Sequence, residues 1–300
     1  MQALKKILGS YNRYRFNWLV KDVLYTQPLQ PQGDSPVIVS MLCHRDVMMY
    51  LLAIKSFYRR LGRGRIVIIN DGSLTARDIE LLNYHVQPSA YEQAHRLHSP
   101  KCPTYISWKK LFCIAHHIRD AFTIQLDSDT LTTGSALSEV SDCIDSGTSF
   151  ILGTWQNQEI GPMMEAVVAA KAHPSQHVQM LAERSFERLP DVENLKYVRG
   201  CSGFDGFAQG AFDMDYLEHF SGQMFRLIGD KWNEWGSEQT ISNVIVANSD
   251  KGTVLPYPKY YNYWGEVKPA DFIHFVGSYR YHGGVYVREA RKVIRELLAQ

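Results

Sequence analysis

The sequence predicts an α/β fold whose first half is built on a mainly parallel sheet. Residues 37–42 and 65–70 are short apolar, β-branched runs with the length and composition of buried strands. Between them, residues 46–60 place apolar side chains at helical spacing, and Thr75 and Asp78 have the spacing of a capping box that starts a second helix. Strand, helix, strand, helix within about 50 residues is typical of a parallel sheet flanked by helices.

The rest of the chain alternates less regularly. Further strands are expected at residues 121–126, 150–153 and 253–256. Helices are expected at residues 107–117, 135–145, 162–172, 175–187, 214–220, 237–248 and 284–299. Residues 200–212 are rich in glycine and aromatic side chains and are predicted to be irregular. Without repeats or low-complexity tracts, residues 36–300 are predicted to form one domain with inserted elements and a C-terminal helix.

Residues 1–35 are predicted to be a basic helical extension followed by a Pro/Gly linker at 27–33. The extension carries five basic residues against the single acid Asp22, namely Lys5, Lys6, Arg13, Arg15 and Lys21. Apolar residues interleave with them. Residues 1–30 therefore form either an amphipathic helix on an anionic membrane surface or an accessory helix packed on the main domain.

Composition narrows the function classes. Of the 300 residues, 45% are hydrophobic and 21% charged, which suits a globular protein with a sizeable core. A formal net charge of +1 argues against a nucleic-acid partner. The five cysteines form no C-x-x-C pair, which argues against structural zinc and favours a reducing, cytoplasmic compartment. No apolar run reaches the length of a membrane-spanning helix. Oligomeric state is left open.

The acidic pair Asp127 and Asp129 is the main candidate site. Its spacing alone is weak, because Asp213 and Asp215 repeat it at the expected start of a helix, where Asp is a usual N-cap. Asp127 and Asp129 instead follow an apolar strand, and ligands of open α/β sheets bind beyond the carboxyl ends of strands. Paired carboxylates suit Mg²⁺ or Mn²⁺, which stabilise the charge on a departing diphosphate, and an imidazole ligand favours Mn²⁺.

The order of an apolar strand, the Asp71-Gly72-Ser73 loop and the Leu126–Thr130 segment resembles the DxD glycosyltransferases of the GT-A fold. The likeness is strongest to the glycogenin and galactosyltransferase type of family 8 and covers roughly residues 37–280. It implies a Rossmann-like, mainly parallel sheet with inserted acceptor-side elements. It also implies a nucleotide-sugar donor, with a UDP-sugar expected, and a carbohydrate, lipid-linked or protein acceptor.

The same resemblance implies roles for single residues. The metal ligands are Asp127, Asp129 and, from the Phe272–Gly277 segment, His274. Asp71 contacts the nucleotide, Asp127 and Lys110 the donor, and Gly277 with Arg280 the diphosphate. Glu238 is the candidate catalytic residue that the resemblance implies. Asp205, taken from its own Gly/Phe-rich segment, is a second catalytic candidate that would contact the donor sugar or the acceptor.

Alternatives stay open for several of these residues. Asp71 also suits a plain turn, and Lys109 competes with Lys110 for the donor. Glu238 is either a general base or a positioning acid, or only a carboxylate favoured at a helix N-terminus. Four aromatic residues suit either sugar stacking or the core, namely Trp232, Trp235, Tyr263 and Trp264.

The chain departs from the family at three places. Arg280 and Glu238 stand where the family usually has Lys and Asp, and the family's Asn-Ala-Gly strand is matched only by residues 207–210. The expected function is metal-dependent transfer of a hexose-type sugar to an acceptor hydroxyl with retention of configuration. The alternatives are an inverting enzyme with Glu238 as base and a catalytically idle nucleotide-sugar-binding protein. A nucleotidyltransferase is disfavoured because residues 43–46 lack the glycine-rich loop of that class.

Overall fold

The structure is a computed structural model that describes residues 2–299, with side chains from residue 9 onward. Its α-helices are α1 (Gln2–Leu19), α2 (Val47–Leu61), α3 (Ala76–His85), α4 (Trp108–His117), α5 (Ser138–Ser146), α6 (Met163–Lys171), α7 (Val178–Ser185), α8 (Met214–Ile228), α9 (Ser237–Asn248) and α10 (Val285–Leu298). Its strands are β1 (Val37–Leu42), β2 (Arg65–Asn70), β3 (Ala90–Gln93), β4 (Thr123–Leu126), β5 (Thr130–Thr132), β6 (Ser149–Leu152), β7 (Gly161–Pro162), β8 (Lys196–Tyr197), β9 (Cys201–Phe207), β10 (Gly252–Leu255), β11 (Tyr260–Asn262) and β12 (Phe272–His274).

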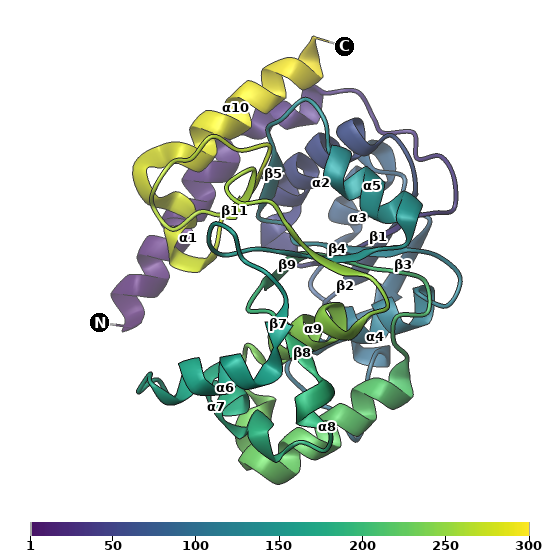
Figure 1. The fold of residues 1–300 in the computed structure, drawn as a ribbon. Helices are drawn as coiled ribbons and strands as arrows, with labels where there is room; N and C mark the ends of the chain where they lie inside the picture. Colours follow the sequence, from purple (N-terminus) through teal and green to yellow (C-terminus); the bar gives the residue numbers. More distant parts are fainter. Residues whose placement is uncertain (1, 300) are drawn as a thin grey trace.

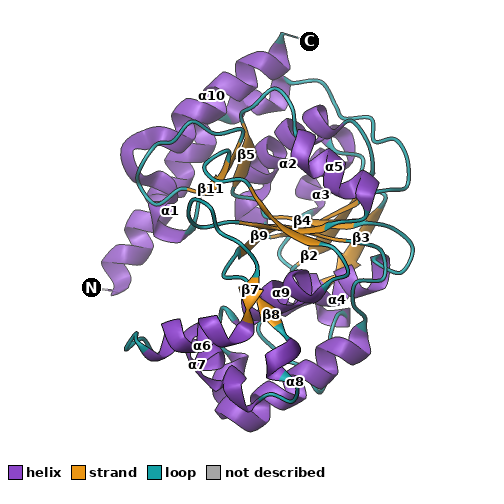
Figure 2. Ribbon diagram, in the orientation of Figure 1, coloured by secondary structure: helices purple, strands orange, loops and turns teal. Residues whose placement is uncertain are grey.

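A seven-stranded sheet forms the centre of the molecule, in the order β10-β6-β9-β4-β1-β2-β3 (Figure 2). β1 pairs in parallel with β2 and β4, and β2 pairs in parallel with β3. β9 runs antiparallel to both of its neighbours, β4 and β6. A smaller sheet of β11, β12 and β5 stands beside the main one, and β5 begins four residues after β4 ends. This short connection joins the two sheets at the carboxyl end of β4.

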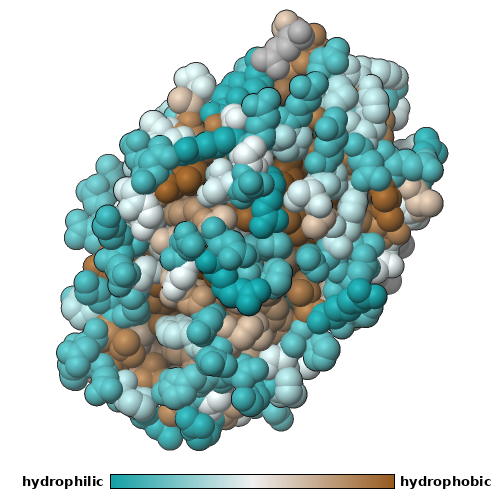
Figure 3. Space-filling model, turned by 90° about the vertical axis from the view of Figure 1, so that its right-hand side faces the viewer, coloured by the Kyte–Doolittle hydropathy of each residue, from teal (hydrophilic) through white to brown (hydrophobic). Residues whose placement is uncertain are grey.

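Helices cover both faces of the main sheet (Figure 1). One core contains the apolar faces of α2 and α10 together with residues of the small sheet, and the other contains those of α4, α8 and α9. The β-branched residues of β1 and β2 alternate between these two cores, as a strand buried on both faces requires. The face in Figure 3 is mostly hydrophilic, with apolar residues showing between polar ones. The predicted α/β class with a mainly parallel, helix-flanked sheet is therefore confirmed.

Most predicted elements are present with bounds shifted by a few residues. The capping box forms at Thr75 and Asp78, and Asp213 Oδ1 accepts the Tyr216 backbone N–H at 2.8 Å as the N-cap of α8. The prediction that residues 200–212 are irregular is wrong, because residues 201–207 form β9 in the middle of the sheet. The edge strand β3 was not predicted. Its four residues are all only half-buried, so it lacks an apolar run.

The N-terminal helix packs against the main body. Phe16 of α1 and Val20, which directly follows this helix, belong to the same core as the sheet. The Phe16 ring lies 4.5 Å from the Tyr286 ring of α10, centroid to centroid. The linker is held by the buried Lys55, whose Nζ donates to Thr26 Oγ1 at 2.8 Å and to the carbonyl oxygen of the next residue. Of the two alternatives for residues 1–30, the accessory helix packed on the main domain therefore describes the face of α1 that carries Phe16. The division of the chain near residue 35 stays a prediction.

Candidate metal centre

Three side chains converge where the two sheets meet. Asp127 directly follows β4, Asp129 directly precedes β5, and His274 ends β12. β12 pairs antiparallel with β5, so that His274 lies opposite Thr130, and the Phe275 N–H donates to the Asp129 carbonyl at 2.8 Å. One ligand atom from each of the three side chains lies within 4.8 Å of the other two. The small sheet thus brings a histidine 145 residues away in sequence to the acidic pair.

A hydrogen bond orients the imidazole of His274. Its Nδ1 lies 2.8 Å from Asn262 Oδ1, and its Nε2 lies 3.3 Å from Asp129 Oδ1. The amide oxygen can only accept, so Nδ1 carries the proton toward Asn262 and Nε2 faces the carboxylates. Metal-binding histidines are usually fixed by such a partner on the far nitrogen. Asn262 reaches this position because β11 pairs with β12 in register, and nothing in the sequence marked it.

The imidazole is also confined by glycine. Gly203 of β9 lies so close that a Cβ there would overlap the His274 ring. Cys201 Sγ lies 3.4 Å from His274 Nδ1 on the same side. Burial disfavours the charged ring, but Cys201 and Asp129 together raise the pKa of His274 well above its ordinary value. Gly203 lies in the segment predicted to be irregular, so its contact with the histidine could not be foreseen.

Two cations stand against the acidic pair. Lys110 of α4 is buried and places Nζ 2.8 Å from Asp127 Oδ1, while Arg280 forms an ion pair with Asp129. Burial alone would lower the pKa of Lys110, but Asp127 holds it above its ordinary value. Burial would likewise raise the pKa of Asp129, which Arg280 and His274 instead keep well below its usual range. Lys109 Nζ instead donates to the Leu97 carbonyl at 2.5 Å, so Lys110 is the lysine at the site.

Two further carboxylates lie within the electrostatic reach of Lys110. Asp205 of β9 pairs with Gln125 of β4 and is fully buried. Neither of its oxygens makes a well-formed hydrogen bond among the described residues, and the nearby Ser242 side chain only partly offsets the effect of burial on its pKa. Glu238 is buried in the first turn of α9, and its Oε2 accepts the Gly236 N–H at 2.9 Å. Burial raises the pKa of both carboxyl groups, most strongly that of Asp205.

The donor atoms of this cluster suit a divalent cation. Asp127 and Asp129 each face one cation, Lys110 and Arg280, whereas burial raises the pKa of Asp205 and Glu238 and so disfavours their charged forms. Two carboxylates and one oriented imidazole are a donor set that fits Mn²⁺ or Mg²⁺, with the imidazole favouring Mn²⁺. The residues present therefore fit the predicted metal.

The remaining predicted residues lie farther out. Asp71 is exposed after β2, and its Oδ1 accepts from Ser73 N at 2.8 Å and Ser73 Oγ at 2.6 Å, which closes the predicted turn. Gly277 is exposed and begins the 3₁₀ segment that presents Arg280. Of the aromatic candidates, Trp232 and Tyr263 are buried core residues, whereas Trp235 and Trp264 are 62% and 57% exposed. Only the last two are free to contact a ligand.

This chain is similar to known proteins in its three-dimensional structure but not in its sequence. No family model and no curated protein matches the sequence. An active-site mutant of LgtC is similar at 9% identity over 87% of this chain and 96% of its own, with a TM-score of 0.52. WbbM, a bifunctional glycosyltransferase, is similar at 15% identity over 91% of this chain, with a TM-score of 0.50. The chain spans about half of WbbM, 53% of its length.

A third similar structure is the glycosyltransferase GlyE of Streptococcus pneumoniae TIGR4. It shares 10% identity over 89% of this chain and 64% of its own, with a TM-score of 0.50. At these identities the comparisons establish the fold and leave the reaction open. The chain has the fold of GT-A glycosyltransferases.

Proposed function

We propose that the protein is a metal-dependent glycosyltransferase that takes a hexose-type sugar from a nucleotide-diphosphate sugar, with UDP-sugar as the expected donor. The observation that carries the proposal is the convergence of Asp127, Asp129 and His274 within 4.8 Å at the carboxyl end of β4. In open α/β sheets, that edge is where ligands bind. The fold of GT-A glycosyltransferases supports the same assignment.

The proposed roles follow from charge and position. A divalent cation held by Asp127, Asp129 and His274 would neutralise the charge that develops on the leaving diphosphate. Arg280, which lies against Asp129, would add a guanidinium to the diphosphate. Lys110 holds Asp127 in place and presents its ammonium to the donor. Asp205, buried without a partner, is proposed to accept from a sugar hydroxyl.

Asp71 and Gly277 have proposed roles at the outer part of the donor. Asp71 lies at the carboxyl end of β2, where the nucleotide would extend, and only its own turn occupies its carboxylate. Gly277 is proposed to let the diphosphate approach the backbone closely. The space beside it is open, because an added Cβ would meet no protein atom, and its φ of +48° favours glycine over other residues. The acceptor hydroxyl belongs to a carbohydrate, lipid-linked or protein substrate.

Retention of configuration is proposed from the resemblance to family 8. One observation favours the inverting alternative, because burial raises the pKa of Glu238 and a general base works best with a pKa near the working pH. The anomeric configuration of the product, followed by proton NMR, separates the two. Glu238→Gln should abolish turnover of an inverting enzyme and only reduce that of a retaining one.

The experiment that tests the function is turnover of a panel of nucleotide-sugars with Mn²⁺, followed by release of nucleoside diphosphate. Removal of the metal with EDTA should stop the reaction, and Mn²⁺ should restore it. Asp129→Asn should remove metal binding while thermal unfolding shows a folded protein. Turnover that survives EDTA, or a protein that binds Mn²⁺ but no nucleotide, would contradict the proposal. Nucleotide-sugar binding without turnover would instead favour the catalytically idle binding protein.

A further inference from the structure

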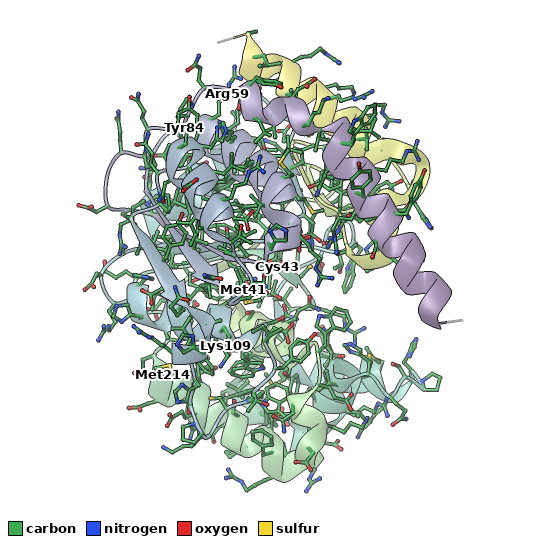
Figure 4. The ribbon with its side chains drawn as sticks, turned by 180° about the vertical axis from the view of Figure 1, so that it is seen from behind. Met41, Cys43, Arg59, Tyr84, Lys109 and Met214 are labelled. Carbon is green, nitrogen blue, oxygen red and sulfur yellow. The ribbon has the colours of Figure 1, made fainter. Side chains whose placement is uncertain are left out.

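A strongly basic groove lies between α1 and α10, apart from the metal cluster. It encloses about 620 Å³. Six cations line it and no acidic residue does, namely Arg15, Arg280, Arg288, Arg291, Lys292 and Arg295. Figure 4 shows the two helices side by side along one edge of the molecule. Arg291 Nε donates to the Leu19 carbonyl at 3.3 Å, which ties the two walls of the groove together.

The positive charge of this edge is local. Residues 9–25 and 280–298 hold eight basic residues and three acidic ones, whereas the whole chain has a formal net charge of only +1. The remainder of the chain is therefore net acidic. Helix α10 explains how the cations are presented, because its apolar face is buried in the core and its basic face points outward. A local excess of cations attracts anionic surfaces within a Debye length, about 8 Å at physiological salt.

Helix α1 adds a stripe of exposed aromatic residues. Tyr11, Tyr14 and Trp18 are 59%, 73% and 59% exposed and follow the 3–4 spacing of one helix face. The opposite face, with Phe16, is buried against α10. Lys21 Nζ lies 5.5 Å from the centroid of the Trp18 ring. Tyrosine and tryptophan combine an apolar body with a polar tip, and they gather at membrane interfaces for this reason.

We propose that α1 and α10 form a peripheral docking surface for membranes that contain anionic phospholipids. The basic groove supplies attraction to phosphate headgroups, and the aromatic stripe supplies residues that insert at headgroup depth. Among the described residues, none of the helices has the length and apolarity to cross a bilayer, so the contact is to the surface. Arg280 lines the groove and also binds Asp129, so this surface adjoins the metal cluster. The proposal concerns binding alone and does not depend on the proposed function.

Co-sedimentation of the full chain with vesicles tests the proposal. Vesicles of phosphatidylcholine with about 30% phosphatidylglycerol should bind the protein at about 0.1 M NaCl, whereas phosphatidylcholine alone should not. The triple change Arg15→Gln, Arg288→Gln and Arg295→Gln should lower the partition coefficient about 100-fold, because each basic residue near an anionic surface contributes about a fivefold factor. All three side chains are exposed and none lies in the metal cluster.

The matched control removes the same charge elsewhere. Arg188, Lys196 and Arg226 are exposed and lie outside the groove, after α7, in β8 and in α8. Their change to Gln should leave binding within about twofold of the wild type. In a second readout, brominated phospholipid should quench tryptophan fluorescence less in Trp18→Phe than in the wild type. Equal binding to neutral vesicles, equal loss in the control triple variant, or no quenching difference would each overturn the proposal.

Discussion

A single methyl group added at Gly203 should disable the proposed metal site while leaving the fold in place. In β9, the Cβ of Gly203→Ala would overlap the imidazole of His274. Nonbonded carbon atoms keep about 3.5–4.0 Å apart, so relief of the overlap requires a shift of more than about 1 Å. The ring is buried, and its Nδ1 is held by Asn262 Oδ1 at 2.8 Å. It therefore cannot move aside without losing that hydrogen bond or its place beside Asp129.

The magnitude follows from metal geometry. Ligand distances in metal sites are tolerated to within about 0.2 Å, so a shift of an ångström removes the imidazole from the ligand set. Loss of even an orienting partner of a ligand typically weakens metal binding about 10–100-fold, and Mn²⁺ affinity should fall by at least that factor. Overpacking should cost about 1–3 kcal/mol of unfolding free energy. Gly203 does not have positive φ, so backbone strain adds nothing to this cost.

Gly206→Ala provides the matched control in the same strand. Its Cβ would overlap the Phe150 ring instead, so it should cost similar stability without touching His274. Mn²⁺ affinity from electron paramagnetic resonance and unfolding by urea would be measured for both variants and the wild type. Wild-type Mn²⁺ affinity in Gly203→Ala, or equal loss in both variants, would refute the reasoning.

Three further predictions concern the buried charges. Lys110→Met should lower the rate of nucleotide-sugar turnover at least tenfold, because Lys110 is ion-paired with Asp127. Lys109→Met removes the same charge one residue away, where the side chain donates to the Leu97 carbonyl, and should change the rate by less than about twofold. Equal effects would mean that the net charge of α4, rather than the position of Lys110, sets the rate. Asp205→Asn should raise the unfolding free energy of the metal-free protein by about 1–3 kcal/mol, because it removes a buried carboxyl without hydrogen-bond partners, while turnover falls; a destabilised variant would contradict this. His85 is buried, and burial lowers its pKa to about 4 from 6.5, so the unfolded state binds more protons between those values. Stability should therefore fall by up to about 3 kcal/mol on acidification from pH 6.5 to 4, and His85→Gln should flatten that slope in urea titrations.

The parallel half of the fold was predictable because its strands are buried on both faces. Strands of this kind read as unbroken apolar runs, and residues 37–42 and 65–70 are such runs. The acidic pair could be placed for the same reason, since Asp127 directly follows the β4 run. His274 was found through its apolar context in β12 and the family resemblance. Its distance to Asp129 required the pairing of β12 with β5, which the sequence does not encode locally.

The antiparallel strand β9 was missed because its glycines serve close packing. Gly203 makes room for His274 and Gly206 makes room for Phe150, so two of its seven residues lack the side chains that mark a strand. In a local reading, such glycines indicate a loop. The same limitation hid Asn262, whose role depends on register with a strand ten residues later. Contacts between distant segments, rather than local propensity, decide these positions.

Asp205 shows how a broken pattern can itself be a signal. An Asp in the middle of a strand that is buried on both faces weakens the fold, because its carboxylate leaves water without gaining a hydrogen bond. Local rules are usually violated where function requires it. The neighbours of Asp205 are consistent with this, since Lys110 and Asp127 share its electrostatic surroundings. A buried carboxylate lowers the stability of the free protein, and a ligand can restore that stability by supplying the missing hydrogen-bond donor. Binding of a sugar should therefore raise the unfolding free energy of the wild type more than that of Asp205→Asn.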